Sequence, residues 1–225
     1  MELTKQQLLQ IDNYIYVCGI KYYDVRTEIV DHFANILEQK LDKNPNLNLK
    51  KEIVNIHRNF SGRGFSKLLK QKTKSVTKKF YKQSLKHLIT FFTLPKILIT
   101  VVLFFVLLQV MNLFENKEHF FMLTVGSGYL LVTLIFIKIY FNKKQKKEYF
   151  LTLDKNISFL QTFNFGVILF STFTQFRLSG SFLNTTHNNI QLVVFVLFIL
   201  FYWSAEHVYY QNKKLVKEQY PNILV

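Results

Sequence analysis

Four apolar runs in the second half of the chain constrain its fold more than any other feature. They cover about residues 97–114, 119–141, 157–176 and 189–210. Inside a bilayer every backbone amide must be hydrogen-bonded within the protein, so each run is expected to form a helix. About 20 helical residues cross a hydrocarbon core of roughly 30 Å. Four runs this close together favour membrane spans over buried helices of a soluble core. The sequence therefore predicts an all-α protein with a four-helix transmembrane bundle.

Clusters of lysine and arginine residues flank these runs on one side only. The stretch 61–89 contains nine basic residues and no acidic residue, and more lysines follow in 143–155 and 213–217. The two opposite connections contain only Lys117 and Arg177. Because basic residues remain on the cytoplasmic side, both termini are expected in the cytoplasm of a bacterium, with the chain crossing its inner membrane several times. No apolar stretch occurs in the first 80 residues, so we expect no cleavable signal peptide.

The formal net charge of +15 is distributed unevenly. Residues 1–60 contain eight basic and eight acidic residues, and the excess begins only at Arg63. A basic stretch beside a membrane attracts anionic headgroups, so we expect the lipid bilayer to be its partner. No nucleic-acid-binding motif accompanies these lysines, and we do not expect nucleic acid to bind.

The distribution of charge and hydropathy divides the chain into four segments. We expect a small cytoplasmic helical domain over 1–65 and a basic juxtamembrane helix over 66–96. The four spans then occupy 97–210, and a cytoplasmic tail covers 211–225.

Local signals predict three short helices within residues 1–60. Thr4 and Gln7 match a capping box, and Gly19 suits the left-handed conformation that ends a helix. Asp24 fits the N-cap of the second helix, and Asn48 fits the N-cap of the third. Cys18 is the only cysteine, and we expect a buried thiol.

The densest polar motif in this domain is D-V-R-x-E-I-x-D-H, from Asp24 to His32. Here the chain resembles the permease-prefix and HAAS-like helical domains that precede membrane spans in many bacterial regulatory and permease-like proteins. The resemblance covers roughly residues 3–60. It implies a module that binds a regulator or partner subunit, so we predict a non-enzymatic membrane protein of regulatory or scaffold type. The predicted partner surface consists of Arg26, Glu28, Asp31 and His32.

Two chemical interpretations of the same motif are open. Glu28, Asp31 and His32, joined by His57 from the next helix, have side chains that bind metals. A helical E-x-x-H pattern normally needs a second copy across a bundle, however, so a solvated polar face is the simpler interpretation. We predict no metal and no cofactor.

Arg26 and His32 also form an R-x5-H pattern. This spacing resembles the catalytic signature of HEPN-type ribonucleases, which pair two such motifs across a dimer. The resemblance implies a membrane-tethered ribonuclease that is accessory to an RNA-targeting CRISPR system, which we keep as an alternative.

The third apolar run carries polar residues at helical spacing. Lipid penalises such a stripe, so it should face protein or water. Hydrogen bonding between helices explains it most simply, whereas an oligomeric channel or pore-forming effector lined by this span is the alternative. The stripe consists of Ser158, Gln161, Asn164, Ser171 and Gln175.

Charged and small residues indicate how the spans pair. Glu206 is the one acidic residue within a span, and Lys138 or Lys213 could form an ion pair with it at the inner end. The motifs Thr124-xxx-Gly128 and Thr162-xxx-Gly166 permit close helix approach and favour the second and third spans as a tight pair.

Overall fold

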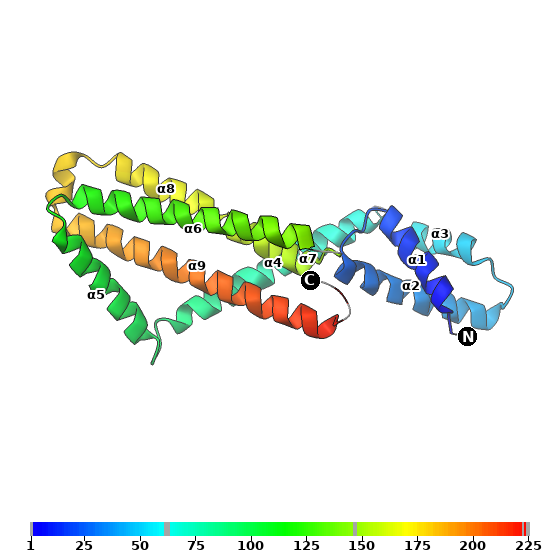
Figure 1. The fold of residues 1–225 in the computed structure, drawn as a ribbon. Helices are drawn as coiled ribbons and strands as arrows, with labels where there is room; N and C mark the ends of the chain where they lie inside the picture. Colours follow the sequence, from blue (N-terminus) through cyan, green and yellow to red (C-terminus); the bar gives the residue numbers. More distant parts are fainter. Residues whose placement is uncertain (1, 61–63, 146–147, 222, 224–225) are drawn as a thin grey trace. The chain divides into compact units, whose positions relative to one another are not determined.

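The computed structural model describes residues 2–60, 64–145, 148–221 and 223, and no β-strand lies among them. The prediction of an all-α protein is therefore confirmed (Figure 1). The elements are α1 Lys5–Val17, α2 Tyr23–Lys43, α3 Leu49–Phe60, α4 Gly64–Thr90, α5 Ile97–Leu113, α6 Lys117–Gln145, α7 Leu151–Gln161, α8 Phe163–Gln175, the short 3-10 helix η1 Ser179–Leu183, and α9 Thr185–Gln219.

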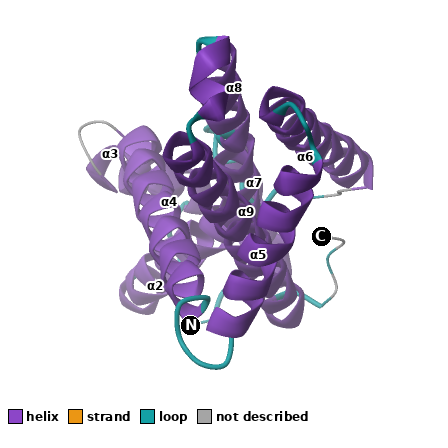
Figure 2. Cartoon of the chain, turned by 90° about the vertical axis from the view of Figure 1, so that its left-hand side faces the viewer, coloured by secondary structure: helices purple, strands orange, loops and turns teal. Residues whose placement is uncertain are grey.

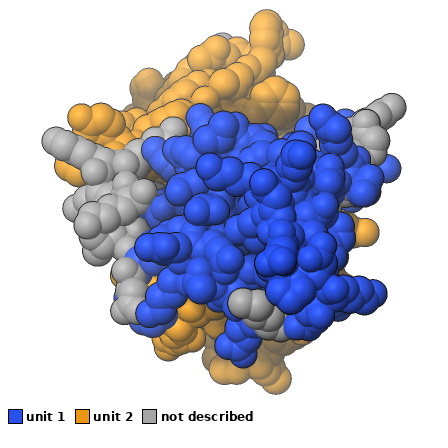
Figure 3. Space-filling view, turned by 90° about the vertical axis from the view of Figure 1, so that its right-hand side faces the viewer, with its two compact units in different colours: residues 1–77, 146–155, 221–225 blue, residues 78–145, 156–220 orange. Residues whose placement is uncertain are grey.

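The chain folds into two compact units, which Figure 3 colours separately. Unit 1 comprises Met1–Thr77, Lys146–Lys155 and Pro221–Val225, and unit 2 comprises Lys78–Gln145 and Asn156–Tyr220. Unit 1 therefore contains the connection between α6 and α7, a segment that the sequence analysis placed only between two spans.

Unit 1 has a core of apolar residues at helical spacing. Ile11 and Ile15 of α1 are fully buried, as are Phe33 and Leu37 of α2. Leu151, from the distant start of α7, joins the same core. Because burial of such a side chain stabilises a fold by about 1.5–3 kcal/mol, these contacts account for the cohesion of this small unit.

The ends of the helices in unit 1 follow the predicted signals closely. Thr4 and Gln7 form the reciprocal capping box, and Gly19 adopts a φ of 99° directly after α1. The Asn48 Oδ1 accepts a hydrogen bond from the Lys51 N–H at 3.2 Å. The prediction for Asp24 is wrong, because α2 begins at Tyr23 and its N-cap is Tyr22.

Three helical segments are long and apolar enough to cross a membrane within the described residues. They are Lys117–Phe141, Leu151–Gln175 and Thr185–Gln219, while the apolar helix Ile97–Leu113 has only 17 residues. Their length and composition are those of a membrane protein.

Unit 2 brings these helices together, and Figures 1 and 2 both place α9 between α5 and α8. α6 packs on α8 and α5 packs on α9. The predicted pairing of the second and third spans is confirmed at Gly128, where an added Cβ would lie 3.3 Å from both Cγ atoms of Val167. Gly166, by contrast, approaches Phe198 of α9 rather than α6.

The third span is interrupted, which the sequence analysis did not predict. α7 ends at Gln161 and α8 begins at Phe163, with Thr162 between them. The Thr162 hydroxyl donates to the carbonyl oxygen of Phe159 at 2.6 Å. Thr162 keeps helical backbone angles, with a φ of −65° and a ψ of −18°, so the interruption is one turn residue within a 25-residue helical segment.

Candidate functional site

A surface groove on unit 1 contains most of the predicted partner surface. Its volume is about 400 Å³, and α2 contributes most of its lining. Residues three and four positions apart share a face of a helix, so Glu28, Asp31 and His32 lie together and are exposed. The groove is lined by Glu28, Ile29, Asp31, His32, Asn35 and Leu68.

The groove combines an apolar floor with a polar rim. Ile29 is buried and Leu68 is half-buried. At the rim, the Lys72 Nζ donates to both carboxylate oxygens of Glu28, at 2.6 and 2.7 Å. Asp31 adds a second carboxylate to this edge. Such a groove suits a segment with an apolar side chain beside a basic one.

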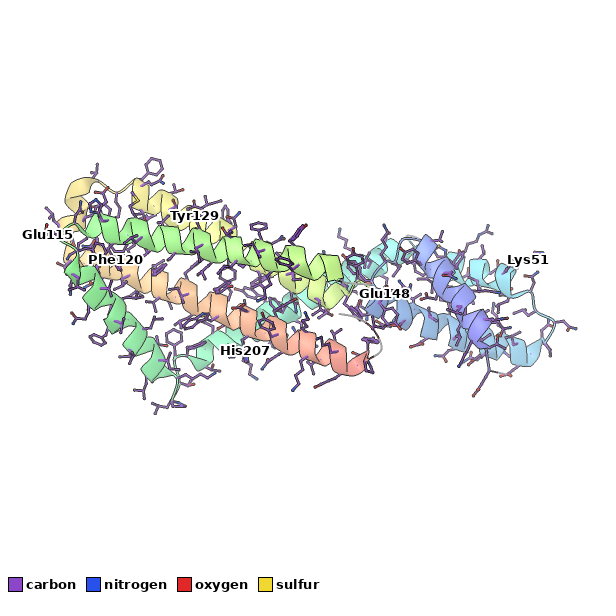
Figure 4. The ribbon with its side chains drawn as sticks, in the orientation of Figure 1. Lys51, Glu115, Phe120, Tyr129, Glu148 and His207 are labelled. Carbon is purple, nitrogen blue, oxygen red and sulfur yellow. The ribbon has the colours of Figure 1, made fainter. Side chains whose placement is uncertain are left out.

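Arg26 lies apart from this groove and inside unit 1, with only 4% of its surface exposed. Its Nε donates to the Asp12 Oδ1 at 2.6 Å, and its Nη2 donates to the Glu148 Oε1 at 3.2 Å. Figure 4 labels Glu148. Burial opposes the charged form, but these hydrogen bonds and carboxylates outweigh it and raise the pKa of Arg26. The structure therefore makes Arg26 an internal ion-pair residue, since positions 26 and 28 point to different faces of α2.

The residues before Arg26 bind the α6–α7 connection. The Asp24 carboxylate accepts from the N–H groups of Leu151 at 2.9 Å and Thr152 at 3.3 Å. Asp24 thus caps α7, a helix more than 120 positions away in the chain. The Tyr22 hydroxyl donates to the Asp154 Oδ2 at 3.0 Å, and the Tyr23 N–H donates to the Tyr149 carbonyl oxygen at 2.7 Å. No signal in a single sequence links residues so far apart.

This geometry gives no support to the chemical alternatives. Arg26 is internal whereas His32 is exposed on the groove, so the two do not share a surface. The described part of the chain contains no group of three or more His, Cys, Asp or Glu that could hold a metal. His57 instead forms a 2.7 Å hydrogen bond with the Tyr14 hydroxyl. Cys18 is exposed and not buried as expected, because it follows the last turn of α1.

The residues of the polar stripe in the third span differ in how far they are buried. Ser171 is buried and accepts a hydrogen bond from Gln175 Nε2 at 3.4 Å. Asn164 is half-buried, while Ser158, Gln161 and Gln175 are exposed. Only Ser171, and in part Asn164, therefore pack against other residues of the same chain, and the remaining side chains of the stripe are exposed.

Lys138 and Glu206 form the ion pair that the sequence analysis considered, with the Nζ 2.6 Å from the Glu206 Oε1. The Lys138 Nζ also lies 4.3 Å from the ring centroid of Tyr210. The pair connects α6 to α9. Next to it, His207 of α9, labelled in Figure 4, stacks on His87 of α4 with ring centroids 4.2 Å apart. These contacts have the character of a packed interface.

The comparisons with known proteins add no relationship to this geometry. No protein-family model matches the chain, and neither a curated protein nor a solved structure matches it.

Proposed function

We propose that this chain is a non-enzymatic, multi-pass protein of the bacterial inner membrane that binds a partner protein through the groove on unit 1. In this proposal α5, α6, the part of α7–α8 that follows Lys155, and α9 form a four-helix transmembrane bundle. Unit 1 lies in the cytoplasm, because the lysine-rich segments adjoin it and basic residues stay on that side.

The packing of unit 1 supports the four-span topology independently of charge. The connection 148–155 belongs to the same compact unit as the N-terminal helices, so both must lie on one side of a membrane. The chain between Thr77 and Glu148 then crosses the membrane an even number of times. If α6 crosses once, as we propose, α5 crosses as well, although it has only 17 residues. A helix of this length spans roughly 26 Å, close to the thickness of a hydrocarbon core.

The observation that carries the partner-binding function is the groove itself. Glu28, Asp31 and His32 are exposed around an apolar floor, whereas residues 22–26 are engaged in contacts within unit 1. Lys72 already balances the charge of Glu28, so the apolar floor beside the Asp31 carboxylate fits a helical partner segment that carries an apolar side chain next to a lysine or arginine.

Site-specific photocrosslinking in cells that express the full chain tests this function. A photoreactive residue at Asn35, inside the groove, should give one discrete adduct. The same residue at Lys50, which is exposed on α3, should not. Asp31→Lys should abolish the Asn35 adduct because it reverses the charge of the rim. An Asn35 adduct that survives Asp31→Lys and also forms at Lys50 would contradict the proposal.

The exposed polar residues of the third span favour one second candidate, an oligomeric pore. A polar side chain at membrane depth is costly unless it faces protein or water, and Gln161 is exposed. Gln161→Leu combined with Asn164→Leu should then reduce ion leakage from liposomes containing the purified chain. Thr172→Leu, at an exposed threonine outside the stripe, is the matched control. Leakage that is absent, or equal in all three proteins, would end this candidate.

A further inference from the structure

The connection between α8 and α9 holds a cation with an unusual set of partners. The Arg177 Nε donates to the Ser181 Oγ at 3.1 Å, and Nη2 donates to the Ser181 carbonyl oxygen and the Asn188 Oδ1, each at 2.8 Å. Nη1 donates to the Gln191 Oε1. Every one of these acceptors is neutral, so they fix the orientation of the guanidinium without cancelling its charge.

No carboxylate compensates this charge within the described residues, because Arg177 makes no ion pair there. Glu115, labelled at this end of unit 2 in Figure 4, lines a neighbouring depression with Glu118 rather than the groove that contains Arg177. Burial lowers the pKa of Arg177 and no acidic group offsets the effect. A guanidinium nevertheless remains protonated at neutral pH. The positive charge of Arg177 is therefore held in place without a compensating anion among the described residues.

This charge lies at the end of an apolar groove between α8 and α9. The groove has a volume of about 720 Å³. It extends along α8 from Gly166 to the C-cap residue Phe176, a rise over ten residue steps of about 15 Å, which is half of a hydrocarbon core of roughly 30 Å. Besides Arg177, its polar lining consists of Ser181, His187 and Gln191.

We propose that this groove binds an anionic phospholipid from the leaflet at the α8–α9 connection, with its phosphate against Arg177 and one acyl chain between α8 and α9. The length of the groove matches one leaflet, and the apolar lining suits a chain rather than a soluble anion. The guanidinium supplies the charge complementarity, and the one N–H on Nη1 that these four hydrogen bonds leave can donate to a phosphate oxygen. This site rests on the membrane placement of α8 and α9, but it does not depend on partner binding by unit 1.

Native mass spectrometry of the purified full chain in detergent tests the site by titration with three lipids. Phosphatidylglycerol should bind more tightly than phosphatidylcholine with the same chains. Oleate should also bind more weakly, because it lacks a phosphate. Arg177→Gln should weaken phosphatidylglycerol binding about tenfold, the factor that corresponds to about 1.4 kcal/mol.

Two further variants separate loss of the site from loss of the fold. Val194→Trp fills the groove at a half-exposed position and leaves the Arg177 hydrogen bonds intact, so it should abolish phosphatidylglycerol selectivity without changing the unfolding temperature in detergent. Lys117 is the basic residue at the α5–α6 connection and lies outside the groove. Lys117→Gln should therefore retain the selectivity for phosphatidylglycerol. Equal binding of the three lipids, or unchanged selectivity in Val194→Trp, would overturn the proposal. Extraction of the chain from membranes by alkaline carbonate would instead refute its membrane placement.

Discussion

Arg26 connects three segments of unit 1, because it donates to Asp12 on α1 and to Glu148 before α7. The two carboxylates are only 28% and 32% exposed, so they would lack both their cation and full hydration in Arg26→Ala. We expect this variant to lower the free energy of unfolding of unit 1 by about 2–3 kcal/mol, a typical value for lost charged hydrogen bonds. Thermal unfolding of the full chain in detergent measures the change.

Arg58→Ala is the matched control for Arg26. Arg58 is exposed on α3, and surface substitutions usually change stability by less than about 0.5 kcal/mol. Equal effects of the two variants would show that the buried network does not stabilise unit 1.

Tyr22 gives unit 1 a dependence on alkaline pH. Burial, and then the hydrogen bond to Asp154, raise the pKa of Tyr22 to about 12. The unfolded chain loses this proton first, near pH 10, so the stabilisation is complete below pH 10 and is lost as pH rises to about 12. The stability difference between the natural chain and Tyr22→Phe should therefore shrink across this window. Unfolding midpoints measured from pH 9 to 12 check it, and a constant difference contradicts it.

The contact between α6 and α8 depends on the missing side chain at Gly128. An added Cβ there would lie 3.3 Å from both Cγ atoms of Val167, whereas a Cβ at Gly126 would meet nothing within 4 Å. We expect Gly128→Leu to destabilise the packing of these helices by about 1–3 kcal/mol, as overpacking usually does. Gly126→Leu, two residues away on the same helix, should not lower the unfolding temperature in detergent. A similar loss in both variants would mean that helix propensity or solubility, and not this contact, is responsible.

The helix ends in unit 1 could be predicted because each signal is local. The Thr4–Gln7 box and the Asn48 cap involve residues within three positions of each other. The role of Asp24 could not be predicted, because its acceptor function is used by Leu151 and Thr152 far along the chain. Its preference for capping was recognised, but the helix that it caps depends on tertiary packing.

The same reasoning applies to the polar residues of unit 2. The sequence limited the partner of Glu206 to Lys138 or Lys213, because a lone charge inside a span is costly, and the structure selects Lys138. The neutral acceptors around Arg177 could not be predicted from the sequence. Ser181, for example, lies in the short η1 helix, and its position depends on tertiary packing. Gln191 is a polar residue within the fourth apolar run, but nothing in the sequence links it to its partners Thr174 and Arg177.

On the scale of the whole molecule, the shared unit of the N-terminal helices and residues 148–155 restricts the membrane topology. On the proposed membrane placement, we expect an even number of crossings between them, whichever side unit 1 occupies. The lysine distribution then predicts the side. The two arguments are independent, so one experiment can test each of them separately.

That experiment uses single cysteines in a Cys18→Ser background and a maleimide that cannot cross membranes. Cysteines at Asn116, before α6, and at Leu183, before α9, should react in intact cells. Cysteines at Asn46 in unit 1 and at Lys217 near the end of α9 should react only after permeabilisation. The reverse pattern would preserve the even crossing number and refute the lysine-based orientation. If the cysteines at positions 46 and 116 react under the same condition, α5 does not cross the membrane. That result would also refute the four-span bundle.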